Sequence, residues 1–230
     1  MIKVLDHGEV TLVESMGGDA AVVAAARVSH GVRYENASKG EAADAKLIKY
    51  LMNLGHGSPF EHTVFTFHIK APLFITRELM RHRIGSFNEI SSRYAELKEE
   101  YYMPEVWRQA SPDNKQSSVV PDNQQKWEPI GGEKTIDKMY EGTVKDAFEI
   151  YHWLLEWGVA REMARMVLPV ATYTEFYWTV NARSLMNFLM LRTAPGAQWE
   201  MQQYAKVILD IFTEKMPLTA AAFAAAGRAP

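Results

Sequence analysis

The segment from Arg81 to Tyr94, with the sequence RHRIGSFNEISSRY, concentrates side chains that can bind anions. It holds three arginines, one histidine, three serines, one asparagine and one glutamate in fourteen positions. Arginine forks match phosphate oxygens bidentately, and Ser91, Ser92 and the backbone amides of a non-helical turn can complete a phosphate-binding cradle. The alternative is a charged helix end followed by a serine-capped turn, and the residue types alone leave both readings open.

The spacing of the cations within this segment limits how one helix could present them. Successive residues of a helix turn by about 100°, so Arg81 and Arg83 would point to nearly opposite sides. One regular helix could not then direct all its cations to one partner. We therefore expect two anionic groups, or two subunits, around this segment.

A second polar segment, GHGSPFEH at 55–62, lies between a predicted helix and a predicted strand. Histidine and glutamate near a turn can indicate a metal site. His56 and His62 are six residues apart, however, and lack the strict spacing of zinc ligands on a helix. We therefore predict no metal site here.

A third polar segment runs from Asn181 to Phe188 and is followed by Arg192. Arg183 and Asn187 are four residues apart and share one face of a predicted helix. Polar side chains on an otherwise apolar helix need partners if they are buried, and the edge of a flat heterocycle provides them.

The elements that must position these segments mix helices and strands without a regular strand-helix-strand repeat. Apolar alternation predicts strands at 2–5, 10–13, 64–69 and 172–180. Helical periodicity predicts helices at 20–28, 41–54, 72–80, 135–157, 161–168, 183–191 and 199–215, the first capped by Asp19. Residues 104–134 are expected to form an exposed loop, and 217–230 form a tail to which no role is assigned. The fold class is α+β, a single domain over 1–230 with antiparallel-type strands.

The overall composition excludes several classes of protein. A chain of 230 residues, 47% of them hydrophobic, can bury one substantial core. The net charge of −3 argues against a protein that coats long nucleic acids. No stretch approaches the roughly 20 apolar residues that span a bilayer, and the N-terminus lacks signal-peptide character, so we expect a cytoplasmic protein without membrane partners. Cysteine is absent, which removes disulfides, thiolate metal ligands and thiolate nucleophiles.

The motif Arg81-His82-Arg83, followed by seven residues and Ser91, resembles the signature of the flavin-dependent thymidylate synthases. Three further stretches resemble the same family: FEH at 60–62, REMAR at 161–165 and WTVNARSL at 178–185. The resemblance extends from the N-terminus to about residue 216, apart from the loop at 104–134.

The resemblance implies a role for each matching position. Positions that hold FAD in related enzymes are occupied here by Ser58, Arg81, His82, Arg83, Asn181, Arg183 and Asn187, with His56 near the flavin and the folate. Positions that contact the nucleotide are occupied by Glu78, Arg81, Ser91, Ser92, Arg93 and Arg165. Glu89 matches the position where both ligands meet, and Arg192 matches the catalytic residue that stabilises charge at the N3 side of the uracil ring.

The activity implied by the resemblance is that of a methyltransferase. It would convert deoxyuridine monophosphate (dUMP) to thymidylate (dTMP), with 5,10-methylenetetrahydrofolate as carbon donor and reduced FAD, restored by NADPH, as hydride donor. The family also implies a homotetramer whose sites are shared between subunits.

Classical thymidylate synthases activate uracil by cysteine attack at C6, a route that this chain lacks. The alternative is a non-catalytic nucleotide- or RNA-binding protein, in which 81–94 is a phosphate patch with stacking aromatics.

Two positions depart from the family pattern. Glu78 stands at a nucleotide-contact position where glutamine is expected, and Gly196 stands where many relatives carry histidine. A carboxylate at position 78 would repel phosphate unless Arg77 or Arg81 neutralises it. The missing histidine is expected to alter packing around the flavin.

Overall fold

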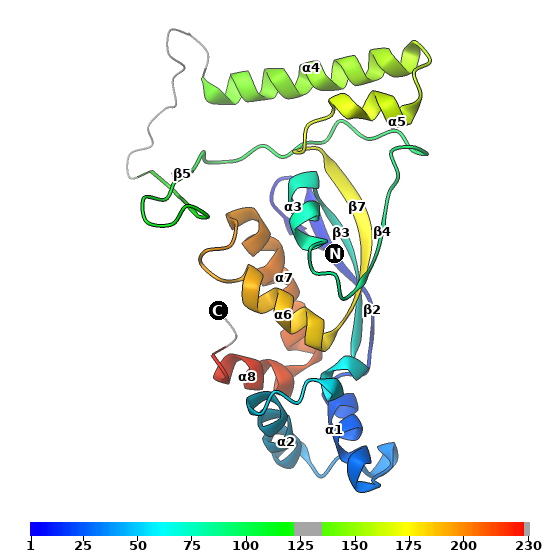
Figure 1. Ribbon diagram of the computed structural model, residues 1–230, viewed down its shortest axis with the longest axis vertical. Helices are drawn as coiled ribbons and strands as arrows, with labels where there is room; N and C mark the ends of the chain where they lie inside the picture. Colours follow the sequence, from blue (N-terminus) through cyan, green and yellow to red (C-terminus); the bar gives the residue numbers. More distant parts are fainter. Residues whose placement is uncertain (122–134, 228–230) are drawn as a thin grey trace.

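The computed structural model describes residues 1–121 and 135–227, and a five-stranded antiparallel sheet runs through the middle of the molecule (Figure 1). The strand order is β1-β2-β3-β7-β4. The strands are β1 Ile2–Val4, β2 Gly8–Met16, β3 Val64–Pro72, β7 Tyr173–Asn181 and β4 Ser86–Glu89. This antiparallel sheet among mixed helices confirms the α+β class.

The pairing of β3 with β7 forms the centre of the sheet. It runs from Val64 opposite Asn181 to Pro72 opposite Tyr173 without a shift of register. Alternate residues on both strands are apolar, so one face of the pair is buried and the other is more polar. Phe67 and Trp178 lie opposite each other on the buried face, with ring centroids 5.8 Å apart. This face requires a cover of helices.

Each central strand leads directly into a helix that covers the buried face. The helix α3, Leu73–Leu79, follows β3, and α6, Ala182–Arg192, follows β7. Asn181 caps α6, because its side-chain oxygen accepts a hydrogen bond from the Ser184 backbone N–H at 2.9 Å. The helix α7, Trp199–Lys215, packs against α6 beside the sheet (Figure 1).

Three helices form one end of the molecule: α1 Asp19–Arg27, α2 Glu41–Asn53 and α8 Pro217–Ala225 (Figure 1). Asp19 was predicted to cap its own helix, and that prediction was wrong. Its carboxylate caps α8 instead, accepting hydrogen bonds from the backbone N–H of Leu218 at 2.8 Å and of Thr219 at 3.0 Å. The Thr219 hydroxyl donates to the same carboxylate at 2.5 Å. Negative charge is favourable at a helix N-terminus, so this contact joins α1 to α8.

The opposite end of the molecule carries α4, Ile136–Glu156, and the short α5, Arg161–Ala164, which lies beside it (Figure 1). Their contact encloses a small apolar cluster of its own, made by Val144, Phe148, Tyr151 and Ala164. The predicted helix at 161–168 is shorter than expected, because a 3-10 turn replaces the α-helix from Arg165 to Val167.

Several elements differ from the expectations drawn from sequence. The strand β4 was not predicted, and the tail at 217–230 contains the packed helix α8. Part of the loop expected at 104–134 forms a two-stranded sheet, β5 Gln109–Ala110 with β6 Ser118–Val119, and residues 122–134 lie outside the described part of the chain. The remaining 3-10 helices are Val28–His30, Tyr34–Asn36 and Ser58–His62. Across 1–121 and 135–227, no helix is both long and apolar enough to cross a bilayer.

The first prediction concerns the cap on α8. We expect Asp19→Ala to lower the free energy of unfolding by about 1 to 2 kcal/mol, because two backbone N–H groups and a hydroxyl lose their acceptor. Urea unfolding followed by circular dichroism measures this loss. Asp146→Ala, at an exposed position of α4, is the matched control. A change at Asp19 no larger than that of the control would show that the cap contributes nothing.

Candidate functional site

The residues predicted to bind ligands meet at a pocket of about 650 Å³ between the loop after α3 and the outer face of α6. Its wall combines polar and apolar groups and carries four arginines. The lining residues are Glu61, Arg81, His82, Arg83, Ile84, Asn181, Arg183, Ser184, Asn187, Leu191 and Arg192. Seven of the side chains singled out from the sequence therefore lie around one cavity.

The geometry of Arg81 to Arg83 differs from the helical arrangement considered from sequence. The helix α3 ends at Leu79, and residues 81–85 form a turn and an irregular stretch. Freed from helical spacing, both arginines and His82 line the same pocket. The inference that these cations must face opposite partners was therefore wrong.

A smaller pocket of about 220 Å³ adjoins the first and shares Arg183 and Asn187 with it. Its other walls are largely apolar, with aromatic and methionine side chains. The full lining is Leu51, Met52, Gly55, His56, Gly57, Phe60, Arg183, Met186, Asn187, Met190 and Phe223. Together the two cavities place a chamber with four arginines next to a smaller one lined mainly by apolar side chains.

Arg183 lies at the boundary between the two cavities. Its guanidinium donates to the Glu61 carboxylate at 2.5 Å. A Cβ atom at Gly57 would lie only 2.5 Å from the Arg183 Nε, so a side chain at position 57 would displace the arginine. Glycine at this position thus allows the guanidinium to reach across the 3-10 helix. Sequence reasoning missed Glu61 as a lining residue, although it belongs to the FEH motif.

Arg192, the last residue of α6, is held by two side chains that come from the end of α3. Its Nε donates to His82 Nε2 at 2.9 Å, and a terminal nitrogen donates to the Glu78 carboxylate. Burial, followed by the charge of Arg192, lowers the pKa of His82 to about 4. The imidazole is therefore neutral near pH 7, and its accepting Nε2 assigns the proton to Nδ1. Glu78 is neutralised by Arg192, and neither of the arginines proposed from sequence, Arg77 and Arg81, takes this role.

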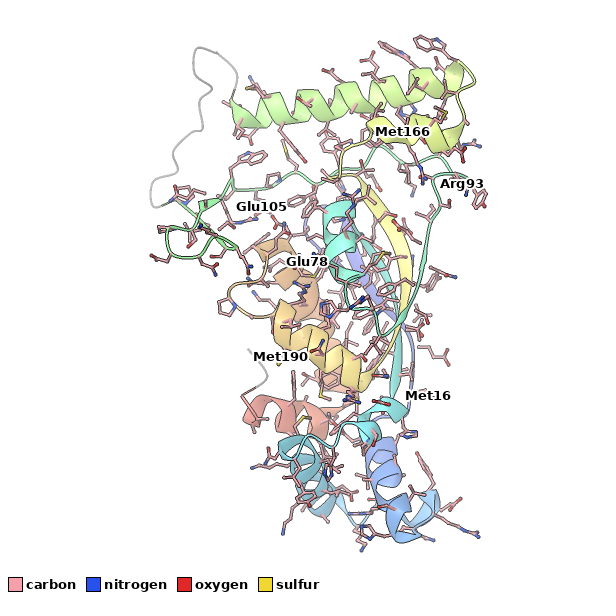
Figure 2. The ribbon with its side chains drawn as sticks, viewed as in Figure 1. Met16, Glu78, Arg93, Glu105, Met166 and Met190 are labelled. Carbon is pink, nitrogen blue, oxygen red and sulfur yellow. The ribbon has the colours of Figure 1, made fainter. Side chains whose placement is uncertain are left out.

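A second group of predicted residues lies after β4, away from the pocket. Arg165 donates to the buried Ser92 hydroxyl at 2.9 Å, and Arg93 pairs with Glu162 at 3.2 Å. Figure 2 shows Arg93 near the opposite edge of the molecule from α6. Ser91 does not line the 650 Å³ pocket either.

Two predicted residues stand apart from both groups. The Glu89 carboxylate accepts a hydrogen bond from the Thr174 hydroxyl at 2.8 Å, which fixes it at the end of β4. Ser58 opens the 3-10 helix Ser58–His62, next to Gly57, but lies outside the lining of both cavities. One chain therefore does not bring all the predicted ligand contacts to one place.

Comparison with known proteins identifies related sequences over nearly the whole chain. Residues 11–218 match the family model Thy1, described as thymidylate synthase complementing protein. The flavin-dependent thymidylate synthase of Thermosipho africanus is 52% identical over 221 residues, covering 96% of this chain and 92% of that protein. The protein of the same name from Thermus thermophilus is 49% identical, covering 96% of this chain and 77% of its relative.

A solved structure is also similar. The UMP/dUMP methylase PolB from Streptomyces cacaoi, bound with 5-Br dUMP, superimposes with a TM-score of 0.86. It is 39% identical, and the match covers 99% of both chains. The names of these relatives describe enzymes and give no support to a non-catalytic binding protein.

The second prediction concerns His82. In the ligand-free protein we expect its imidazole to titrate near pH 4, because burial and Arg192 both oppose its charged form. The unfolded chain then binds the proton more readily than the folded one, so His82 lowers stability as the pH falls from 6.5 towards 4. Histidine NMR titration measures the pKa, with His82→Gln to assign the signal. A midpoint near 6.5 would contradict the buried, neutral state.

Proposed function

The chain belongs to the flavin-dependent thymidylate synthase family, and on that premise we propose that it converts dUMP to dTMP. In this proposal 5,10-methylenetetrahydrofolate provides the carbon, FAD the hydride, and NADPH the electrons that restore the flavin. The observation that carries the proposal is the single pocket lined by Arg81, His82 and Arg83 on one side and by the polar face of α6 on the other. The absence of cysteine agrees with a route that needs no thiolate.

The two adjoining cavities fit a flavin dinucleotide in size and in chemistry. Ligand pockets commonly measure about 300 to 1,000 Å³ and combine apolar walls with a few polar groups. The 650 Å³ chamber offers guanidinium groups for a pyrophosphate, and the 220 Å³ chamber offers methionine and phenylalanine side chains for a flat ring. When bound, FAD supplies the hydride of the reaction, and the protein contributes position and charge.

Arg192 is suited to recognise the pyrimidine. Its guanidinium is part of the pocket wall and is held by hydrogen bonds to Glu78 and to His82, which lines the same pocket. Donors held in advance of the reaction stabilise charge that develops on a ring oxygen or nitrogen without a cost of reorganisation. A neutral His82 adds no second positive charge beside the ring. We propose that this arrangement, in place of a covalent nucleophile, favours methyl transfer at the uracil.

We propose further that the enzyme is a homotetramer with sites completed by neighbouring subunits. The nucleotide contacts expected at Ser92, Arg93 and Arg165 lie apart from the pocket of their own chain. Apolar side chains just after α4 and in the 3-10 turn after α5 are also exposed, among them Trp157 at 75% and Met166 at 71%. Exposed apolar clusters of this kind mark protein interfaces.

The third prediction tests the activity. The purified protein should be yellow with bound flavin and should form dTMP from dUMP, methylenetetrahydrofolate and NADPH. Arg192→Ala should retain the flavin but lose about 2 to 4 kcal/mol of transition-state stabilisation, because it removes a charged donor from the pyrimidine. Flavin absorbance and a dTMP assay measure the two properties, and Glu214→Ala, at an exposed site on α7, is the control. A colourless, inactive wild type would refute the function, and a fully active Arg192→Ala would refute the role of Arg192.

The fourth prediction tests shared sites by co-expressing two inactive variants. If Arg192 and Arg165 reach one site from different chains, random mixing of Arg192→Ala with Arg165→Ala restores both arginines to about a quarter of the sites. In the matched control, Arg192→Ala is mixed with Arg183→Ala, whose two positions line one pocket of one chain, so no such recovery is expected. Steady-state dTMP formation measures the recovery. Equal activity in the two mixtures would rule out this division of the site.

A further inference from the structure

Glu78 and His82 hold the guanidinium of Arg192 from two directions. Both come from the C-terminal end of α3 and the turn that follows it, four residues apart, while Arg192 ends α6. His82 accepts from Nε at 2.9 Å, and Glu78 accepts from a terminal nitrogen. One hydrogen bond leaves a guanidinium free to swivel, whereas two acceptors on different nitrogens fix both its position and its plane.

The two contacts leave part of the guanidinium available to a ligand. A guanidinium carries five N–H donors, and these two bonds occupy two of them. Arg192 lines the 650 Å³ pocket, whereas Glu78 does not. Because Glu78 is outside this lining and bonds to Arg192, we take its effect on a ligand to pass through the arginine. Figure 2 shows Glu78 near the middle of the molecule, beside α6.

The charge balance agrees with a role in orientation. Arg192 and Glu78 form an ion pair of opposite charges, so the net charge of the pair is close to zero, and each side chain is 20% exposed. Arg81 and Arg83 line the same pocket and are exposed, and within 1–121 and 135–227 neither forms an ion pair with a carboxylate, so they are the side chains suited to attract a phosphate. Arg192 then contributes directed donors more than net charge.

We propose that Glu78 is a positioning residue for Arg192, which sets the direction in which the remaining guanidinium N–H donors face the pyrimidine ring. This inference rests on the proposed function, because the pyrimidine is the ligand assigned to that pocket. It differs from the nucleotide contact expected from sequence, because Glu78 acts through Arg192 and does not touch the ligand.

The fifth prediction uses three variants that separate the acceptor from the bulk of the side chain. Glu78→Ala removes both, Glu78→Met keeps the bulk without an oxygen, and Glu78→Gln keeps an oxygen acceptor without the charge. A positioning role predicts that Ala and Met lower kcat by about tenfold or more with a KM for dUMP within about threefold of wild type. Glutamine should recover most of that loss, because it still accepts a hydrogen bond from Arg192. Flavin content should remain as in wild type, and Glu214→Ala is again the control for an exposed carboxylate.

Three kinetic outcomes would overturn the proposal. A raised KM with wild-type kcat in all three variants would mean that Glu78 binds the nucleotide directly. A lowered KM in all three would mean that Glu78 competes with the nucleotide for Arg192. A loss in Ala that Met repairs would reduce Glu78 to packing, and it would equally contradict the proposal.

A measurement without turnover keeps this test separate from the proposed function. The Arg192 Nε–H signal, assigned by its loss in Arg192→Lys, should exchange slowly with water in wild type and in Glu78→Gln. It should exchange about tenfold faster or more in Glu78→Met, because the guanidinium has lost one of its two acceptors. Fast exchange in the wild type would refute the positioning role even in an active enzyme. Slow exchange in a wild type that forms no dTMP would instead refute the proposed activity alone.

Discussion

The antiparallel pairing of β3 with β7 is the constraint on which the site depends. Because the strands are antiparallel, α3 leaves one end of the pair and α6 leaves the other, and the two helices run towards each other over the same face. At 1.5 Å per residue, α3 spans about 10 Å and α6 about 16 Å, while the nine-residue strands span about 30 Å at 3.3 Å per residue. The helix lengths together nearly equal the strand length, so their C-terminal ends meet. A shift of register by one residue would exchange the buried and exposed faces of the strand and separate the two ends.

Aromatic side chains in the core beneath the pocket link the central strands to the loop that carries His82 and Gly85. Trp178 of β7 stacks on Phe87 of β4 with ring centroids 6.0 Å apart and meets Phe188 of α6 edge-on at 5.1 Å. Phe188 in turn meets the His82 ring at 5.1 Å. A Cβ at Gly85 would lie 2.8 Å from the indole nitrogen of Trp178, so the loop passes directly over the indole. The position of the pocket wall is therefore set by buried aromatic packing as well as by its own polar contacts.

Local signals in the sequence were sufficient for most of the regular elements. The nine residues of β7 alternate, and Asn181 marks the start of α6 by a capping bond to a residue three positions later. By contrast β4 has only four residues, and it becomes a strand by pairing with the edge of β7. Asp19 precedes an alanine-rich helix, which suggested a local cap, yet its carboxylate satisfies N–H groups 199 and 200 positions away.

In the candidate site too, the residues could be identified from local sequence motifs, whereas their contacts with distant parts of the chain could not. The motif residues of the loop and of α6 could be named from their order in the chain, and the structure brings many of them to one pocket. The contact of Arg192 with Glu78 joins positions 114 residues apart, and that of Arg165 with Ser92 joins positions 73 apart. Such pairs follow from tertiary packing, because several side chains of suitable charge compete for each arginine. Glu61 was missed for this reason, since its partner Arg183 lies 122 positions away.

The contact between Asp19 and α8 also bears on how the chain acquires its structure during synthesis. Residues 217–225 pack against α2, and Phe223 from the same helix closes one wall of the smaller cavity. The first two helices leave the ribosome long before this segment does. Until α8 has emerged, α1 and α2 lack the helix against which they finally pack, and the Asp19 carboxylate lacks the N–H groups whose hydrogen bonds it accepts. Contacts between such distant parts of a chain form slowly, because a long loop has to be closed first. One wall of the ligand-binding region is therefore completed only after residues 217–225 have been translated, and termination before this segment would leave apolar surface of α2 open to chaperones and proteases.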